Sequence, residues 1–123
     1  MLYAILCYND ERVVEGWTKE EDDAVIAKRM AVQQKLAAQG RLGPVARLMP
    51  TTAATTIRSS GREPVILDGP FAETKEQLLG FYIVDCPTLD HAIDAARQLK
   101  EGEAVGAFEI RPLRFFLPGG GAG

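Results

Sequence analysis

The pattern of apolar and polar residues divides the chain into six short strand-like segments and two longer segments with helical spacing. Residues 2–8 and 79–85 are apolar on both alternating faces, so each is expected to be a strand that is covered on both sides. Residues 60–62 (Ser-Gly-Arg) predict the turn of a hairpin. The predicted strands are residues 2–8, 41–49, 51–59, 63–68, 79–85 and 107–116.

The first predicted helix follows Thr18 and ends near Gln39, before Gly40. Glu21 lies three positions after Thr18, which is the spacing of a capping box. On a helical wheel one wide arc is apolar and a narrow opposite arc is expected to face solvent. The apolar arc contains Val25, Ile26, Met30, Val32, Leu36 and Ala37, and the solvent arc contains Lys28, Lys35 and Gln39.

Two polar residues of this helix, Arg29 and Gln33, fall inside the apolar arc. In one interpretation the arc is simply broad, and Arg29 extends past its neighbours to water. In the other, Arg29 and Gln33 face a pocket between the helix and a sheet. The pattern alone leaves both interpretations open.

The second predicted helix begins after Thr88, its expected N-cap, and ends at residues 101–102. Its apolar positions follow the i, i+3, i+4, i+7 rule, and His91 lies on the opposite face, where it is expected to be a surface residue. Pro112 lies inside the last predicted strand, which indicates an edge strand or a bulge.

This order of elements predicts an α+β fold, a ferredoxin-like βαββαβ sheet with an inserted β-hairpin and both helices on one face. Two helices cover only one side of the sheet, although its central strands are apolar on both sides. We therefore expect a second copy to cover the other side, which would make the protein a homodimer packed sheet to sheet. Residues 1–117 form one predicted domain, and residues 118–123 a frayed glycine-rich tail.

Composition narrows the range of partners. The chain has 123 residues, a net charge of −3 and scattered arginines, which argues against nucleic acid. No apolar run is long enough to span a membrane, and the first residues lack a secretory signal, so a cytoplasmic protein is expected. Cys7 and Cys86 lie in strand-like runs, at opposite ends of the sheet, and are predicted to be buried free thiols. No cysteine or histidine spacing suggests a metal, and no cofactor is expected.

The sequence Asp68-Gly69-Pro70-Phe71 interrupts the chain between two strands that are expected to be buried. Gly69 permits unusual dihedral angles, Pro70 fixes φ, and Phe71 is expected to anchor the loop in apolar material. Asp68 is the candidate catalytic residue, since a carboxylate beside apolar groups can act as a general base. The alternative is that Asp68 only caps its own turn.

Lys75 and Tyr82 are two further candidate ligand contacts. Lys75, in the charged segment after this loop, either meets a ligand or is solvated surface. Tyr82, on the following strand, either presents its hydroxyl to a cleft or belongs to the core or to the dimer interface.

The run DGPFAETKEQLLGFYIVDC, with AAQGRLGP before it and FEIRPL after it, resembles the YCII-related, or DGPF-domain, family of small bacterial proteins. The resemblance covers residues 1–114. It implies a dimeric α/β-barrel of ferredoxin-like protomers, a cleft beside the DGPF loop, and frequent encoding beside extracytoplasmic-function sigma factors. Some relatives look like enzymes with a histidine on the first helix; that position holds Arg29 here, which cannot exchange protons near pH 7.

Three classes of function follow. The first is a small enzyme that acts on an anionic organic or aromatic metabolite, with Asp68 as base and Arg29 holding the anion. The second is a non-catalytic protein that binds a small anionic ligand with Arg29, Gln33, Gly69, Pro70, Phe71, Lys75 and Tyr82. The third is a regulatory protein associated with a sigma factor. The sequence does not choose between the first two.

Overall fold

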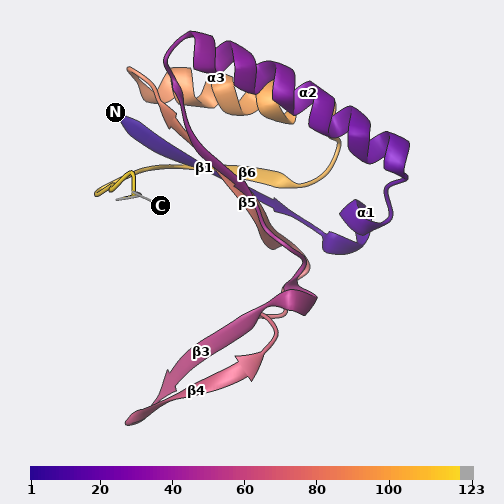
Figure 1. Ribbon diagram of the computed structural model, residues 1–123, viewed down its shortest axis with the longest axis vertical. Helices are drawn as coiled ribbons and strands as arrows, with labels where there is room; N and C mark the ends of the chain where they lie inside the picture. The colour runs from indigo at the N-terminus through magenta and orange to yellow at the C-terminus, as the bar shows by residue number, and fades with distance from the viewer. Residues whose placement is uncertain (120–123) are drawn as a thin grey trace.

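A four-stranded antiparallel sheet with two long helices on one face forms the body of the protein (Figure 1). The structure is a computed structural model and describes residues 1–119. A two-stranded hairpin extends away from the side of the sheet that the helices leave open (Figure 1). The elements are β1 (Leu2–Asn9), α1 (Glu11–Glu15), α2 (Lys19–Ala38), β2 (Leu42–Arg47), the 3-10 turn η1 (Thr51–Ala53), β3 (Thr55–Ser60), β4 (Glu63–Asp68), β5 (Gln77–Asp85), α3 (Leu89–Lys100) and β6 (Ala107–Pro112).

The strand order of the sheet is β2-β5-β1-β6, and every neighbouring pair is antiparallel. This is the α+β arrangement that the order of elements predicted, with β1 and β5 in the centre and β6, which ends at Pro112, at an edge. The register of β2 on β5 shifts between Leu42 and Val45, where Gly43 and Pro44 interrupt the ladder. The sheet is open at both edges within residues 1–119, so the described chain does not close into a barrel.

The core lies between the helices and the sheet. Alternate residues of β1 and β5 point toward the helices and pack against small residues of α3. The buried residues of this core are Tyr3, Ile5, Cys7, Leu36, Tyr82, Val84, Cys86, Ala92, Ala95, Ala96 and Leu99. Both cysteines are buried and free, as predicted.

Helix α2 begins as predicted. The Thr18 side chain accepts a hydrogen bond from the backbone N–H of Glu21, and the Glu21 side chain accepts one from the backbone N–H of Thr18. Gly40 follows the helix with a φ of 70°. The predicted arcs need one correction: Lys28 is half-buried against the loop after α3, whereas Ile26 and Met30 are exposed. The cause is that α2 packs beside α3 as well as on the sheet, which the periodicity of one helix does not reveal.

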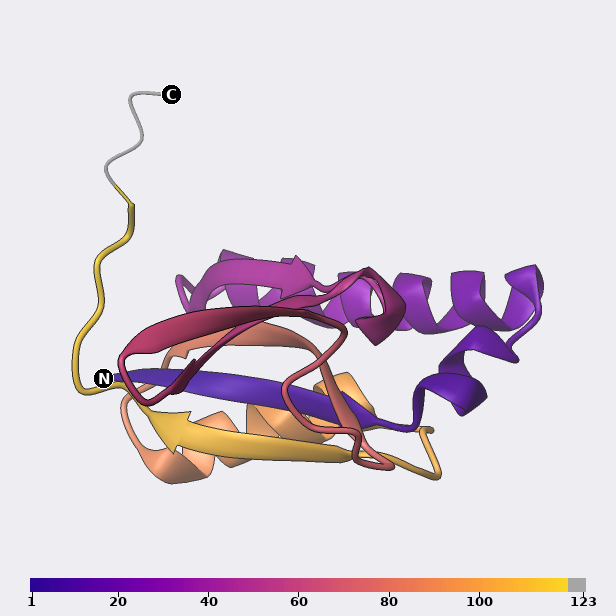
Figure 2. The ribbon, with the colours of Figure 1, turned by 90° about the horizontal axis from the view of Figure 1, so that it is seen from below.

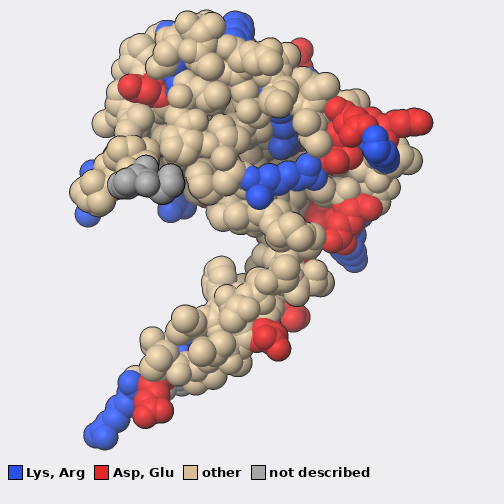
Figure 3. Space-filling model, viewed as in Figure 1, with Lys and Arg blue, Asp and Glu red and all other residues tan. Residues whose placement is uncertain are grey.

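The hairpin of β3 and β4 corrects a second prediction. Val65, Ile66 and Leu67 were expected to be buried, but every residue of β4 is exposed, because the hairpin projects from the sheet (Figure 1) and pairs mainly with itself. Seen from below, the hairpin lies in front of the sheet (Figure 2). Phe71 is likewise 75% exposed and does not anchor its loop. Lys, Arg, Asp and Glu side chains lie mostly at the tip and along one edge of the hairpin, and the rest of its visible surface is uncharged (Figure 3).

Helix α1 was not predicted. Asp10, the residue after β1, is its N-cap and accepts a hydrogen bond from the backbone N–H of Arg12. No helix among residues 1–119 is long and apolar enough to cross a membrane. Of the predicted frayed tail, residues 120–123 lie outside the described chain.

Candidate functional site

A cavity of about 270 Å³ lies between α2 and the sheet, on the side toward α1. One wall comes from α2, the floor from β1 and β5, and the far wall from β6 and the loop before it. Most of its lining is apolar, and a few polar groups converge in it, which is the usual character of a small-molecule site. The apolar lining includes Val25, Ile26, Met30, Val45, Val105 and Phe108, and the polar lining includes Cys7, Asp22, Arg29, Gln33, Arg47, Tyr82 and Glu103.

Two cations share the carboxylate of Glu103, which lines this cavity with Arg29. Arg29 donates from Nε to Oε2 of Glu103 at 3.2 Å and from Nη2 to Oε1 at 2.6 Å, a two-pronged pairing that suits the planar guanidinium. Lys28 donates from Nζ to Oε2 of the same carboxylate at 2.8 Å. The Glu103 side chain is only 8% exposed. The cluster of Lys28, Arg29 and Glu103 therefore carries one net positive charge.

The loop before β6 brings Glu103 to α2. Lys100, in the last turn of α3, donates from Nζ to the backbone oxygens of Glu103 and Val105, at 3.1 and 3.2 Å. Gly106 has a φ of 89°, and a Cβ there would lie 2.8 Å from the backbone oxygen of Tyr8, so only glycine fits where the loop returns to the sheet. Arg29 also lies over the ring of Phe108, with its Cζ atom 5.4 Å from the centroid.

Tyr82 and Gln33 complete the polar end of the cavity beside Arg29. Burial raises the pKa of Tyr82, and the positive charge of Arg29 lowers it by less. The Tyr82 hydroxyl therefore stays neutral near pH 7 and can donate a hydrogen bond. The polar end thus offers a neutral O–H donor next to a cationic cluster.

None of the shifted pKa values in the cavity moves closer to pH 7. Burial raises the pKa of Cys7 to about 12, so its thiol stays protonated and unreactive. Burial raises the pKa of Glu103, but hydrogen bonds from Arg29 and Lys28 outweigh burial and the pKa is lowered. Burial, the largest single effect, lowers the pKa of Arg29, but the hydrogen bond to Glu103 and the nearby Tyr82, Glu103 and Cys7 together outweigh burial, so the pKa is raised. These groups therefore keep one protonation state around pH 7.

The structure brings three of the predicted site residues together and separates the others from them. Arg29, Gln33 and Tyr82 line the cavity. Gly69, Pro70 and Lys75 line a different, open recess with Asp10 and Arg12 at the root of the hairpin. Asp68 is exposed at the end of β4, and Phe71 is exposed beyond it; neither is among the residues that line the cavity.

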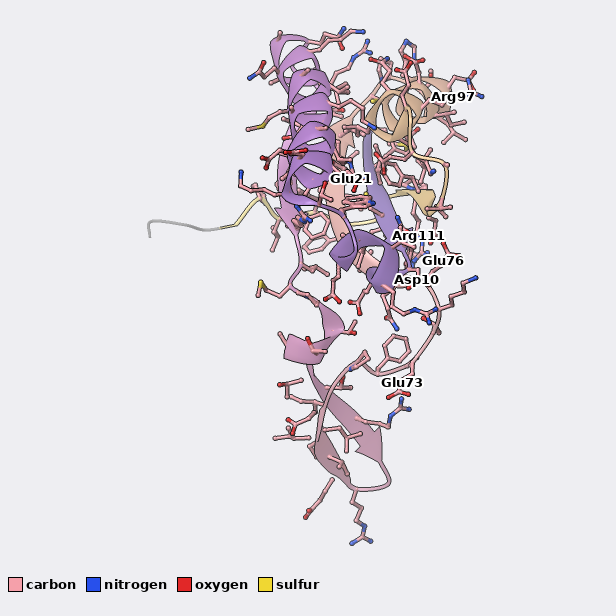
Figure 4. All side chains as sticks on the ribbon, turned by 90° about the vertical axis from the view of Figure 1, so that its right-hand side faces the viewer. Asp10, Glu21, Glu73, Glu76, Arg97 and Arg111 are labelled. Atoms are coloured by element: carbon pink, nitrogen blue, oxygen red, sulfur yellow. The ribbon has the colours of Figure 1, made fainter. Side chains whose placement is uncertain are left out.

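Hydrogen bonds from β3 hold the DGPF loop. The backbone N–H of Gly69 donates to Ala54, the Thr56 hydroxyl donates to the Gly69 oxygen at 2.7 Å, and Arg58 donates to the Phe71 oxygen at 2.8 Å. The chain then passes Glu73 and Glu76 toward Asp10 at the start of α1 (Figure 4). This loop is therefore fixed by the hairpin and stands apart from α2.

Glu103 is the residue of this site that the sequence did not single out. It follows the glycine that ends α3, in a loop with no periodic pattern. Only the packing of α2 beside α3 brings it to Arg29, 74 positions away in the chain. The one indication of this ion pair in the sequence comes from its other member, Arg29, which interrupts an apolar arc.

Comparisons with known proteins give one family and one near relative. A family model described as the YCII-related domain matches residues 1–117. The protein R00369 of Rhizobium meliloti (strain 1021), named as uncharacterized, is 58% identical over 120 residues, which are 97% of this chain and 97% of that protein.

Proposed function

The chain belongs to the YCII-related family, and we propose that its cavity binds a small organic carboxylate without transforming it. The observation that carries this proposal is the polar end of the cavity, where Tyr82 and Arg29 line the wall together. Arg29 belongs to the net positive cluster with Glu103 and Lys28, and Lys28 pairs with Glu103 from outside the lining. A carboxylate accepts a hydrogen bond from a phenol and is stabilised by a neighbouring cation. The apolar walls then suit the hydrocarbon part of the same molecule.

Binding is favoured over acid–base catalysis because of the protonation states. A general base works best with a pKa near the working pH. Cys7, Tyr82 and Arg29 all have raised pKa values, and Glu103 has a lowered pKa and is held by two cations. Asp68, the earlier candidate base, lies on the exposed hairpin outside this cavity.

The test is calorimetric titration of the protein with benzoate and butanoate, paired with the change Tyr82→Phe. Removing one donor to a charged acceptor costs about 1.5–3 kcal/mol, so affinity is expected to fall at least about tenfold. The phenylalanine keeps the shape of the wall, and the fold should remain intact.

Tyr3→Phe serves as the matched control, because Tyr3 is buried in the core but does not line the cavity. Equal affinity in the Tyr82→Phe protein, or no binding of either carboxylate to the natural chain, would refute the proposed function. Formation of a product from the bound ligand would replace it with an enzymatic one.

We further propose that two copies pack through the open sheet face and form the dimeric α/β-barrel. The face away from the helices carries apolar residues of β1 and β5, and no helix of the described chain covers it (Figure 1). Contiguous apolar surface of this kind is commonly an interface. The exposed apolar residues Ile57, Val65, Ile66 and Leu67 of the hairpin lie on the same side of the sheet and would extend the contact.

Sedimentation velocity at micromolar concentration is expected to give a dimer. Leu6→Arg, which places a charge on the open face, should shift the protein toward monomer while circular dichroism keeps its native form. Ala31→Arg, on the exposed side of α2, should leave the dimer unchanged. A monomeric natural protein would contradict the proposed interface.

A further inference from the structure

A second recess adjoins the cavity. It has a volume of about 470 Å³ and lies along the outside of α1, the start of α2 and the segment after β2. Five residues line both the cavity and this outer groove: Val14, Trp17, Asp22, Arg47 and Leu79. These five residues lie between the two spaces, and we call them the neck.

The neck has a charged side and an apolar side. Arg47 donates from Nη2 to Oδ1 of Asp22 at 3.1 Å and so ties the end of β2 to the first turn of α2. Val14, Trp17 and Leu79 make up the apolar side. The apolar side does not include either partner of this ion pair.

The outer groove continues this apolar character. Leu48 and Met49 line it and are 45% and 77% exposed, although both are large apolar residues. Besides Asp22 and Arg47 of the neck, its charged lining residues are Glu11, Glu15 and Lys19, which belong to α1 and the start of α2. The groove therefore has an apolar side, formed by the segment after β2, that continues from the apolar side of the neck.

The distances along α2 set the length of a ligand that would use both spaces. Asp22, at the neck, precedes Arg29 by seven positions, which is about 10 Å along a helix. A carboxylate held at Tyr82 must therefore carry a chain of about that length before it reaches the neck. A short acid would stay wholly inside the cavity.

We propose that the ligand is a straight-chain carboxylate whose head binds at Tyr82 and Arg29 and whose alkyl tail passes Trp17 into the outer groove. This inference rests on the proposed function and names its ligand class. Trp17 and Met49 then determine specificity for chain length, since both contact the tail and neither contacts the head.

Calorimetric titration with butanoate and tetradecanoate tests the inference, because butanoate stays in the cavity and a tetradecanoate chain is long enough to extend past the neck. Full burial of a methylene tightens binding about fourfold, and burial of a partly exposed methylene, with about half of that free energy, about twofold. Ten added methylenes should therefore tighten binding about a thousandfold. Met49→Asp should weaken tetradecanoate about tenfold and leave butanoate unchanged, because Met49 lines only the outer groove.

Leu117→Asp is the matched control, since Leu117 is 73% exposed and lines neither space. Equal affinities for butanoate and tetradecanoate would overturn this inference and leave the proposed function standing. A gain for tetradecanoate that persists undiminished in Met49→Asp would also overturn it, because the tail would then lie elsewhere. Failure of both acids to bind would remove the proposed function and this inference together.

Discussion

Replacing Glu103 with glutamine is expected to lower the melting temperature by about 8–12 °C. The change leaves Lys28 and Arg29 side by side without their shared carboxylate. Breaking a fully buried ion pair costs about 3–5 kcal/mol. Here the Lys28 and Arg29 side chains keep 31% and 24% of their exposure, so a smaller loss of about 2–3 kcal/mol is expected, which for a domain of this size corresponds to that shift.

The pH dependence identifies the carboxylate as the cause. The pKa of Glu103 is lowered in the folded protein, because hydrogen bonds from Arg29 and Lys28 exceed the effect of burial. Its contribution to stability is therefore complete above its unfolded pKa of about 4.3 and is lost as the pH falls through the lower folded pKa. The difference in unfolding free energy between the natural protein and Glu103→Gln should be constant from pH 6 to 8 and shrink below about pH 4.

Glu101→Gln provides the control for this measurement. Glu101 lies on the same loop, and its side chain is exposed; Lys28 contacts only its backbone oxygen. The substitution should change the melting temperature by no more than about 2 °C, in line with other surface changes. A loss as large as that of Glu103→Gln would mean that the loop, and not the ion cluster, is responsible.

Local chemistry explains why most of the fold was predictable from the sequence. The caps at Thr18 and Thr88, the turn at Gly61 and the two-sided apolar strands are each determined by a few neighbouring residues. The order of elements then restricts the topology, because short right-handed connections leave few alternatives. The same local logic drew attention to Arg29 and Gln33, whose charge and polarity interrupt an apolar arc.

The remaining features depend on contacts between distant segments. The apolar residues of β4 have the same pattern as a buried strand, so the sequence could not show that the hairpin leaves the body of the protein. The prediction that Asp68 is a catalytic base depended on the burial expected for this strand. Glu103 was overlooked because its role arises only when a loop of no distinctive pattern meets α2.

Replacing Arg29 with methionine is expected to separate ligand binding from stability. Glu103 keeps Lys28 as a partner in this variant, so less stability should be lost than in Glu103→Gln, where two cations are left unpaired. Carboxylate affinity should instead fall about 10- to 100-fold, because the cluster becomes neutral and the cation beside Tyr82 in the cavity is lost.

Glu103→Gln should therefore lower the melting temperature more than Arg29→Met does, and Arg29→Met should lower the carboxylate affinity more than Glu103→Gln does. Glu103→Gln raises the charge of the cluster from one to two, so at temperatures where it stays folded it should bind benzoate or butanoate at least as tightly as the natural protein. Arg29→Lys keeps the charge but replaces a planar fork with a single ammonium, and its affinity should lie between those of the natural protein and Arg29→Met. If affinity instead follows melting temperature across all three variants, Arg29 acts only through stability, and the anion must bind elsewhere.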